Sequence, residues 1–341
     1  MWFGTYNGLN RYDGLNFVVY KHNPTDSASL PDDLVRTIFE DHNKNLFIGT
    51  NGGLCLYNRK MDNFLNYMID KSSPLKGIKC MVLKIAEDSL GNLWLGTDNR
   101  LIYFDRNNNK IVQYTHDPNN PKSINDNSVE GLLIDKYKRL WVTTQKGFNL
   151  FLPETKTFKH ITRAKNGAFD LSNTYFMDLT EDREGIIWLG SRDGLYCFQN
   201  NPEAKIINLI HYKHDDQDKY NITNNRVKSL YVDDGGDLWV GTENWGMNLF
   251  DRKNKRFWRY RKDDYDPNSL NNESIQAIYQ DKEGNLWVCT FSGGINVALK
   301  NKDAIISYQS LPGAPLSLSY NTVACFLEDH LGRIWVGTDG R

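Results

Sequence analysis

The sequence predicts an all-β protein, a seven-bladed β-propeller of four-stranded antiparallel blades. A tryptophan-centred motif recurs at nearly constant spacing along the 341 residues, and the stretch around each copy divides into four short strands. No helical period competes, because β-branched and aromatic residues dominate the apolar runs. Four-stranded units of about 47 residues, repeated seven times, are typical of propellers, whose blades bury their apolar faces by stacking radially.

The motif WxGT sets the register of the repeat. Its aromatic residue recurs at intervals of 45, 47, 47, 47, 51, 48 and 48 residues, and an Asp stands six residues before each of the last seven copies. The aromatic positions are Trp2, Phe47, Trp94, Trp141, Trp188, Trp239, Trp287 and Trp335. We expect these side chains to wedge between neighbouring blades, while the small residue two positions later lets the next sheet approach.

Each unit contains strands A to D. Strand A is an apolar run ending at the Asp, such as SVEGLLID, and an Asp-Gly turn joins it to strand B, such as LWVGT. A tight turn leads to strand C (GLYCF), and a charged turn leads to strand D (FWRYR). Residues 2–20 supply B, C and D without an A, whereas residues 321–328 supply an A without C and D. Strands from both chain ends are therefore predicted to close the ring.

We expect residues 1–341 to form a single propeller domain. The proposed closure leaves the last strand B, within residues 333–341, in surplus. That strand either begins a following propeller or is displaced. Because the pattern opens and closes in mid-unit, we expect the chain to be a piece of a longer protein.

Composition narrows the function. The net charge of −1 argues against a nucleic-acid binder. The sequence contains no run of about 18 apolar residues, the length that a membrane-spanning helix needs. The cysteines are odd in number and lack CxxC pairs, so we expect buried residues within strands and no metal site. No cofactor or catalytic motif is found. The cysteines are Cys55, Cys80, Cys197, Cys289 and Cys325.

The unit VxxIxxDxxGxLWxGTxxGLxxYD resembles the two-component-regulator propeller repeat over essentially the whole chain. The resemblance implies the N-terminal propeller of the sensor region of a Bacteroidetes hybrid two-component system. It implies a periplasmic location, a homodimer, and a parent protein with a second propeller, a β-sandwich and a histidine kinase. It also implies an oligosaccharide ligand and control of polysaccharide-utilisation genes, with no enzymatic activity in this fragment.

The sequence departs from the repeat at a few positions, which we interpret as tolerated variation. Lys44 and Lys138 replace the turn Gly, and Thr143 and Cys289 replace the Gly of WxGT. Arg100 replaces the Gly that opens strand C.

Candidate ligand-binding residues lie on the face formed by the B–C turns and D–A connections, which varies between blades. The units of Trp239 and Trp287 have B–C hairpins one residue longer, and each adds an aromatic residue. An exposed aromatic ring beside polar groups suits a sugar, whose C–H face stacks on the ring. The candidates are Tyr6, Arg100, Tyr175, Arg192, Asp193, Arg226, Glu243, Asn244, Trp245 and Phe291.

Alternatives remain open at this stage. Trp245 could instead pack on a neighbouring hairpin, and Phe291 could fill a gap at the rim. The domain could be a scaffold or dimerisation propeller with no small ligand. A propeller lyase or glycosidase is a further alternative, although no strand A begins with clustered carboxylates or His.

Overall fold

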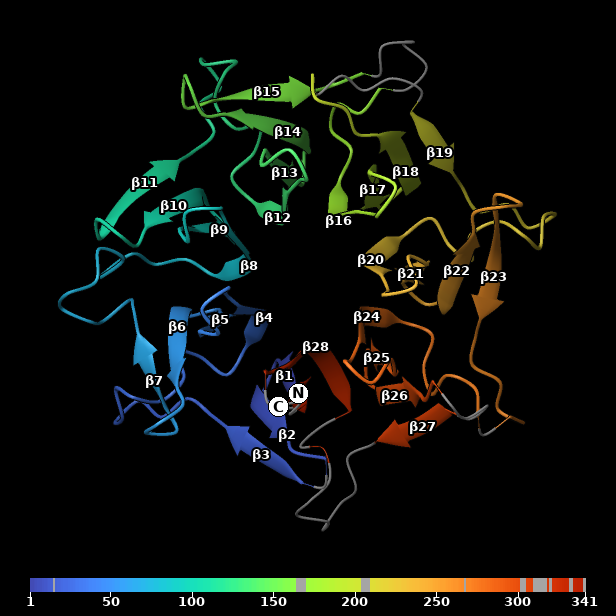
Figure 1. The fold of residues 1–341 in the computed structure, drawn as a ribbon, viewed down its shortest axis with the longest axis horizontal. Helices are drawn as coiled ribbons and strands as arrows, with labels where there is room; N and C mark the ends of the chain where they lie inside the picture. The colour runs from blue at the N-terminus through green and yellow to red at the C-terminus, as the bar shows by residue number, and fades with distance from the viewer. Residues whose placement is uncertain are drawn as a thin grey trace.

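The structure, a computed structural model, forms a ring of seven antiparallel sheets around a central axis (Figure 1). It describes residues 1–14, 16–163, 170–203, 209–266, 268–300, 305–308, 318, 321–330 and 334–339. The predicted all-β propeller is confirmed. Strand A of each blade lies nearest the centre and strand D at the rim (Figure 1). We number the blades I to VII, starting from the blade that contains the N-terminus.

In blades II to VII the strands follow the predicted A-to-D order, and blade I contains an additional strand B. The A strands are β4 (Val35–Glu40), β8 (Val82–Glu87), β12 (Val129–Ile134), β16 (Phe176–Glu181), β20 (Val227–Val232), β24 (Ile275–Gln280) and β28 (Thr322–Glu328). The B strands are β1 (Trp2–Thr5), β5 (Leu46–Thr50), β9 (Leu93–Thr97), β13 (Leu140–Thr144), β17 (Ile186–Ser191), β21 (Leu238–Thr242), β25 (Leu286–Thr290) and β29 (Ile334–Asp339). The C strands are β2 (Gly8–Tyr12), β6 (Gly53–Asn58), β10 (Leu101–Asp105), β14 (Gly147–Leu152), β18 (Gly194–Gln199), β22 (Met247–Asp251) and β26 (Gly294–Ala298). The D strands are β3 (Phe17–Tyr20), β7 (Asn63–Asn66), β11 (Lys110–Tyr114), β15 (Thr157–Ile161), β19 (Ile210–Tyr212), β23 (Arg256–Tyr260) and β27 (Ile305–Tyr308).

Strands from both chain ends close the ring in blade I, as predicted. β1 pairs with β2 along its length, and β28 joins β1 through the pair Trp2↔Leu327. The surplus strand, β29, pairs with β28 and meets β2 at Tyr12↔Ile334, so this sheet has five strands. Residues 333, 340 and 341 lie outside the described part. The assignment of 333–341 to a following propeller stays a prediction.

The described aromatic side chains of the B strands fill the seams between blades, as predicted, while the side chain of Trp335 lies outside the described residues. Trp141 packs with Phe176 and Leu189 of the next blade, and Trp188 packs with Val227 and its neighbours in blade VI. Both Trp side chains are almost completely buried. The small residue of the motif has the expected role. A Cβ at Gly190, for example, would stand 2.8 Å from a methyl carbon of Val227.

The repeated Asp and the repeated Trp are joined by a hydrogen bond that the sequence did not reveal. The indole Nε1–H of Trp141 donates to Asp135 Oδ2 at 2.8 Å. The same bond recurs in blades V, VI and VII, with distances of 2.7, 2.8 and 2.7 Å. The other carboxylate oxygen of Asp135 accepts two backbone N–H groups of the A–B turn. One side chain therefore shapes the turn and orients the wedge.

In three blades an arginine donates a further hydrogen bond to the Asp carboxylate of the preceding blade. The first residue after strand C is Arg59, Arg106 or Arg252 in blades II, III and VI, and its Nη1 lies 3.3, 2.7 or 2.8 Å from Oδ2 of the preceding blade's Asp. In blade V, Asn200 takes this position and donates to Asp135 Oδ2 at 3.1 Å. These contacts link neighbouring blades on the face of the A–B and C–D turns, called the turn face below.

The cysteine prediction is confirmed for burial, and for location with one exception. Cys55, Cys80, Cys197 and Cys289 are buried thiols that form no disulfide. Cys80, however, precedes β8 and lies outside any strand. The side chain of Cys325 lies outside the described residues.

We expect Asp182→Ala to lower the free energy of unfolding by about 3 kcal/mol, because it removes the carboxylate that accepts from the indole N–H of Trp188 and from Arg252 Nη1. Urea unfolding followed by far-UV circular dichroism measures the loss. The control is Asp216→Ala, whose carboxylate is exposed. Equal stability of both variants would contradict the role assigned to the buried Asp.

We also expect acid to destabilise the ring through these carboxylates. Burial alone would raise the pKa of Asp135, but hydrogen bonds from Arg139, Trp141 and Asn200 hold it below its usual value of 3.8. The unfolded chain therefore takes up this proton first. The stabilisation is complete above about pH 4 and is lost as the pH falls through the lower pKa of the folded state. Urea unfolding at a series of pH values measures this slope, which should be shallower in Asp135→Asn than in the unmodified chain.

Candidate functional site

A β-bulge lies near the start of the A strands, which are the strands nearest the centre of the ring. In blades II to VII the register with strand B shifts at the second residue of strand A. A bulge re-aims the side chain that it carries. The bulge residues are Arg36, Leu83, Glu130, Met177, Lys228 and Gln276. Four of the six are polar or charged, on strands that line the centre of the ring.

In three blades the bulge residue interacts with the tip of its own B–C turn. Arg36 Nε donates to Asn51 Oδ1 at 2.7 Å, and Gln145 Nε2 donates to Glu130 Oε1 at 2.8 Å. In blade VI the negative charge of Glu243 favours the charged form of Lys228. The bulge and tip residues thus form polar pairs near the axis of the ring, on the face of the B–C turns. We call this region the channel mouth.

Tyr175 and Arg192, both predicted site residues, join the pair in blade IV. Gln145 Nε2 donates to the Tyr175 hydroxyl at 3.4 Å, and the guanidinium of Arg192 lies 4.1 Å from the centre of the Tyr175 ring. Burial and the neighbouring charge of Glu130 raise the pKa of Tyr175 to about 12. The phenol is therefore neutral at physiological pH and can donate a hydrogen bond.

Arg226 and Glu243, also predicted, form an ion pair beside Lys228. Arg226 Nε lies 2.8 Å from a carboxylate oxygen of Glu243. Burial lowers the pKa of Lys228, and Arg226 lowers it further, against the opposing effect of Glu243. In the adjacent blade, the buried Nε2 of Gln276 has no hydrogen-bond partner among the described residues. The ion pair of blade VI and one unsatisfied amide donor of blade VII therefore lie on neighbouring A strands and turns.

The remaining predicted residues separate into inner and outer positions. Tyr6 lies inside, since the Arg36 guanidinium is 5.1 Å from its ring centre. Arg100 and Asp193 interact toward the rim. Arg100 hydrogen-bonds Gln113 on the outer strand β11, and Asp193 lies 2.8 Å from Lys213 Nζ after β19. The structure does not bring these two residues to the channel mouth.

The two long hairpins stand as the sequence predicts. Trp245 and Phe291 are 45% and 46% exposed, so both rings remain accessible. The Arg261 guanidinium of the same blade covers the Trp245 ring at 4.5 Å. Asn244 has a φ of 67°, a left-handed conformation that Asn tolerates and that accommodates the longer turn.

Sequence reasoning missed the bulge residues. A signal was present, because a charged or amide side chain follows the first apolar residue of strand A in VR, VE, VK and IQ. Strand alternation alone did not show that a bulge would direct these groups to the channel mouth.

The described residues contain no cluster of three His, Cys, Asp or Glu side chains that could hold a metal ion. They also contain no helix long and apolar enough to cross a membrane. The groups gathered at the channel mouth are suited to hydrogen bonding and charge pairing.

A family model described as two component regulator propeller matches the chain in six segments: residues 29–52, 78–99, 170–193, 221–244, 269–292 and 317–340. Each segment covers strands A and B of one blade, and none falls on blade IV. Six of the seven blades thus match the two component regulator propeller repeat.

Other relatives cover less of the chain or show only its fold. Histidine kinase P4 of Formosa agariphila is 32% identical over 83 residues, which is 24% of this chain and 6% of that protein. PorZ, a surface component of the type-IX secretion system of Porphyromonas gingivalis, matches with a TM-score of 0.67 at 15% identity, over 94% of this chain and 48% of its own.

The extracellular domain of a putative hybrid two component system from B. thetaiotaomicron is 19% identical, with a TM-score of 0.49. It covers 98% of this chain and 52% of its own. The chain thus spans about half the length of these two solved structures.

We expect Glu243→Gln to lower the pKa of Lys228, because the ammonium loses its nearest opposing charge while Arg226 remains. An NMR titration of the Lys228 side chain, assigned with Lys228→Arg, measures the change. The control is Glu184→Gln, a carboxylate near Arg252 at the opposite face. An unchanged pKa in Glu243→Gln would show that the two groups do not interact in solution.

Proposed function

We propose that this propeller is the ligand-binding part of an extracytoplasmic sensor in a hybrid two-component signalling protein, and that its ligand is a glycan breakdown product. The observation that carries the proposal is the set of polar side chains at the channel mouth of blades VI and VII, where Gln276 Nε2 has no hydrogen-bond partner among the described residues, on the same face as two exposed aromatic rings. The match to the two component regulator propeller repeat supports a sensory role, and the fragment needs no catalytic activity for it.

The chemistry of this face fits an oligosaccharide. Trp245 and Phe291 offer apolar surface for the C–H face of a sugar ring. Lys228 and Gln276 offer donors to hydroxyl or carboxylate oxygens, and Glu243 offers an acceptor that Arg226 already orients. A neutral or acidic sugar would satisfy buried groups that water or protein must otherwise satisfy.

In this proposal the parent protein lies in the periplasm and works as a homodimer, with a second propeller, a β-sandwich and a histidine kinase. Its output is the control of polysaccharide-utilisation genes. A closed ring of packed blades has few soft internal motions. The ligand would therefore act by favouring one rigid-body arrangement of the dimer over another.

The second candidate is a scaffold or dimerisation propeller that binds no small ligand. The observation in its favour is that several predicted site residues already have partners. Arg192 covers Tyr175, Asp193 pairs with Lys213, and Arg261 covers Trp245. A propeller lyase or glycosidase has weaker support, because the channel mouth mixes single carboxylates with basic residues.

A thermal-shift screen against oligosaccharides from plant, mucin and glycosaminoglycan polymers tests the proposal. A ligand that binds only the folded chain, at 100 times its dissociation constant, should add about 2.7 kcal/mol of stability. We expect Trp245→Ala and Arg226→Ala to abolish the shift, and the matched outer variant Trp258→Ala to retain it. A cooperative melt with no shift for any sugar would favour the scaffold.

A further inference from the structure

The seam between blades III and IV lacks the arginine that three other seams carry on the turn face. Where Arg59, Arg106 and Arg252 reach back to the preceding blade, blade IV carries Pro153 as its first residue after strand C. Proline has no side-chain donor and cannot reach Asp88. A cavity of about 350 Å³ lies here, between the A–B turn of blade III and the two turns of blade IV.

Tyr103 compensates for the missing arginine. Its hydroxyl donates to Asp88 Oδ2 at 3.1 Å, and Asn92 Nδ2 donates to the same oxygen at 3.3 Å. Oδ1 of Asp88 accepts the backbone N–H groups of Leu90 and Asn92, each at 2.9 Å. A carboxylate has about four acceptor sites, so Asp88 is already satisfied and needs no cation from a ligand.

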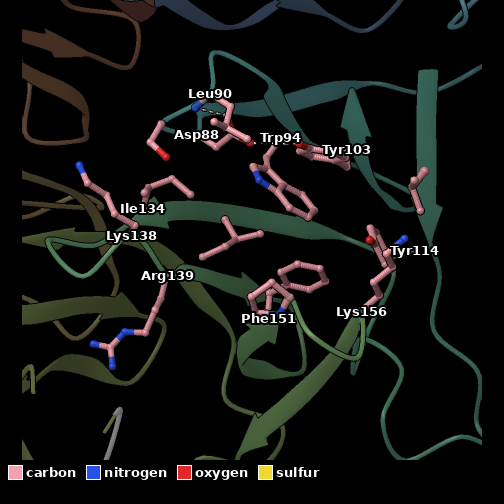
Figure 2. Close-up of a pocket in the computed structure, with 14 residues that line it drawn as sticks. Asp88, Leu90, Trp94, Tyr103, Tyr114, Ile134, Lys138, Arg139, Phe151 and Lys156 are labelled. Atoms are coloured by element: carbon pink, nitrogen blue, oxygen red, sulfur yellow. Dashed lines mark hydrogen bonds between the residues drawn. The ribbon is translucent and has the colours of Figure 1, made fainter. Parts of the chain in front are cut away.

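This replacement leaves the indole N–H of Trp94 without an acceptor. The corresponding Trp residues of blades IV to VII donate to their Asp, but Trp94 makes no hydrogen bond within the described residues. Its ring lies in the cavity wall, with ring centres 4.9 Å from Phe151 and 5.9 Å from Tyr114 (Figure 2). The wall therefore combines aromatic carbon with one unused donor.

Two lysines flank the cavity. Lys138 and Lys156 both line it, and Figure 2 shows them on opposite sides of the aromatic wall. Neither ammonium forms an ion pair within the described residues, whereas Arg139 is held by Asp135 and Asn200. Both lysines occupy left-handed turn positions, with φ of 64° and 54°.

From these groups we propose a second binding site, in the seam between blades III and IV, for an organic anion whose carboxylate or sulfate is carried on one or two rings. The rings stack against Trp94 and Phe151, and an oxygen accepts the indole N–H of Trp94. Lys138 and Lys156 neutralise the anionic groups. An acidic saccharide and an aromatic carboxylic acid share this chemistry. The site lies on the face opposite the channel mouth and does not depend on the function proposed above.

Isothermal titration of the chain with digalacturonate and with 2-naphthoate tests the site, with maltose as the neutral probe and inorganic sulfate as the probe without a ring. We expect at least one ring-bearing anion to bind and maltose not to bind. Binding of digalacturonate alone identifies an acidic saccharide, and binding of 2-naphthoate alone identifies an aromatic acid. The site is disproved if neither anion binds, or if sulfate binds as tightly as the ring-bearing anions.

Variants place the binding in the seam. Pro153→Arg restores the side chain found in three other blades and should abolish binding by filling the cavity. Lys156→Gln should weaken binding about tenfold, because it removes one charge-assisted contact. Lys255→Gln is the matched control, since Lys255 occupies the same turn position in blade VI with the same φ of 54°. Binding that survives Pro153→Arg would overturn the assignment.

Trp94→Phe tests whether a loss of binding comes from the indole N–H or from a failure to fold. Blade II already has Phe47 at this position, buried to 1% exposure, so the repeat accepts a phenyl ring there. This variant removes the indole N–H and should weaken binding while the melting temperature stays close to that of the unmodified chain. Unchanged affinity in Trp94→Phe would contradict the proposed hydrogen bond. Sugar binding at the channel mouth should survive Pro153→Arg, so the two proposals fail independently.

Discussion

The fold depends most on the Asp that follows each strand A, which is buried in six of the seven blades. Its carboxylate accepts backbone N–H groups of the A–B turn, the indole N–H of the wedge Trp in four blades, and a donor from the next blade at several seams. A buried carboxylate is unfavourable unless such donors surround it. Turn shape, wedge orientation and blade spacing are therefore coupled through one side chain, which explains why the Asp and the aromatic residue keep a constant separation of six residues.

Because of this coupling, the two faces of the ring are under different structural constraints. The Asp-centred face carries the contacts that hold neighbouring blades together, so most of its turns must stay alike. The opposite face also links neighbouring blades, but through backbone hydrogen bonds, such as that from Gly194 N–H to Asn225 O, which do not fix the side chains of the turn tips. Its B–C tips and bulge residues differ from blade to blade, from Arg36 and Asn51 to Lys228 and Glu243. Binding groups can vary there at little cost to the packing of the ring.

Sequence periodicity was sufficient for the architecture, because one-dimensional spacing directly encodes a repeated blade. It identified the strands, the closure by both chain ends and the wedge role of residues such as Trp141. It also placed Trp245 and Phe291 on long, exposed hairpins. It failed for features that depend on departures from regular strand geometry. The bulge that carries Lys228 follows from register, and Arg100 and Asp193 interact toward the rim because their partners, Gln113 and Lys213, lie on and beyond outer D strands.

Blade IV lacks a contact to its neighbour at the outer side of the ring, and contacts near the centre of the ring compensate for it. It lacks the outer arginine, and at its inner edge Gly131 provides no side chain. Lys84 of blade III passes this strand and reaches Asp178 of blade V at 3.1 Å. The second oxygen of Asp178 accepts the backbone N–H of Leu230 in blade VI, at 2.9 Å. Blades III, V and VI are thus linked around the channel side of blade IV. We infer that these inner contacts hold the neighbouring blades in place although Pro153 replaces the arginine that would link blades III and IV. A binding cavity at Pro153 is then compatible with a stable ring.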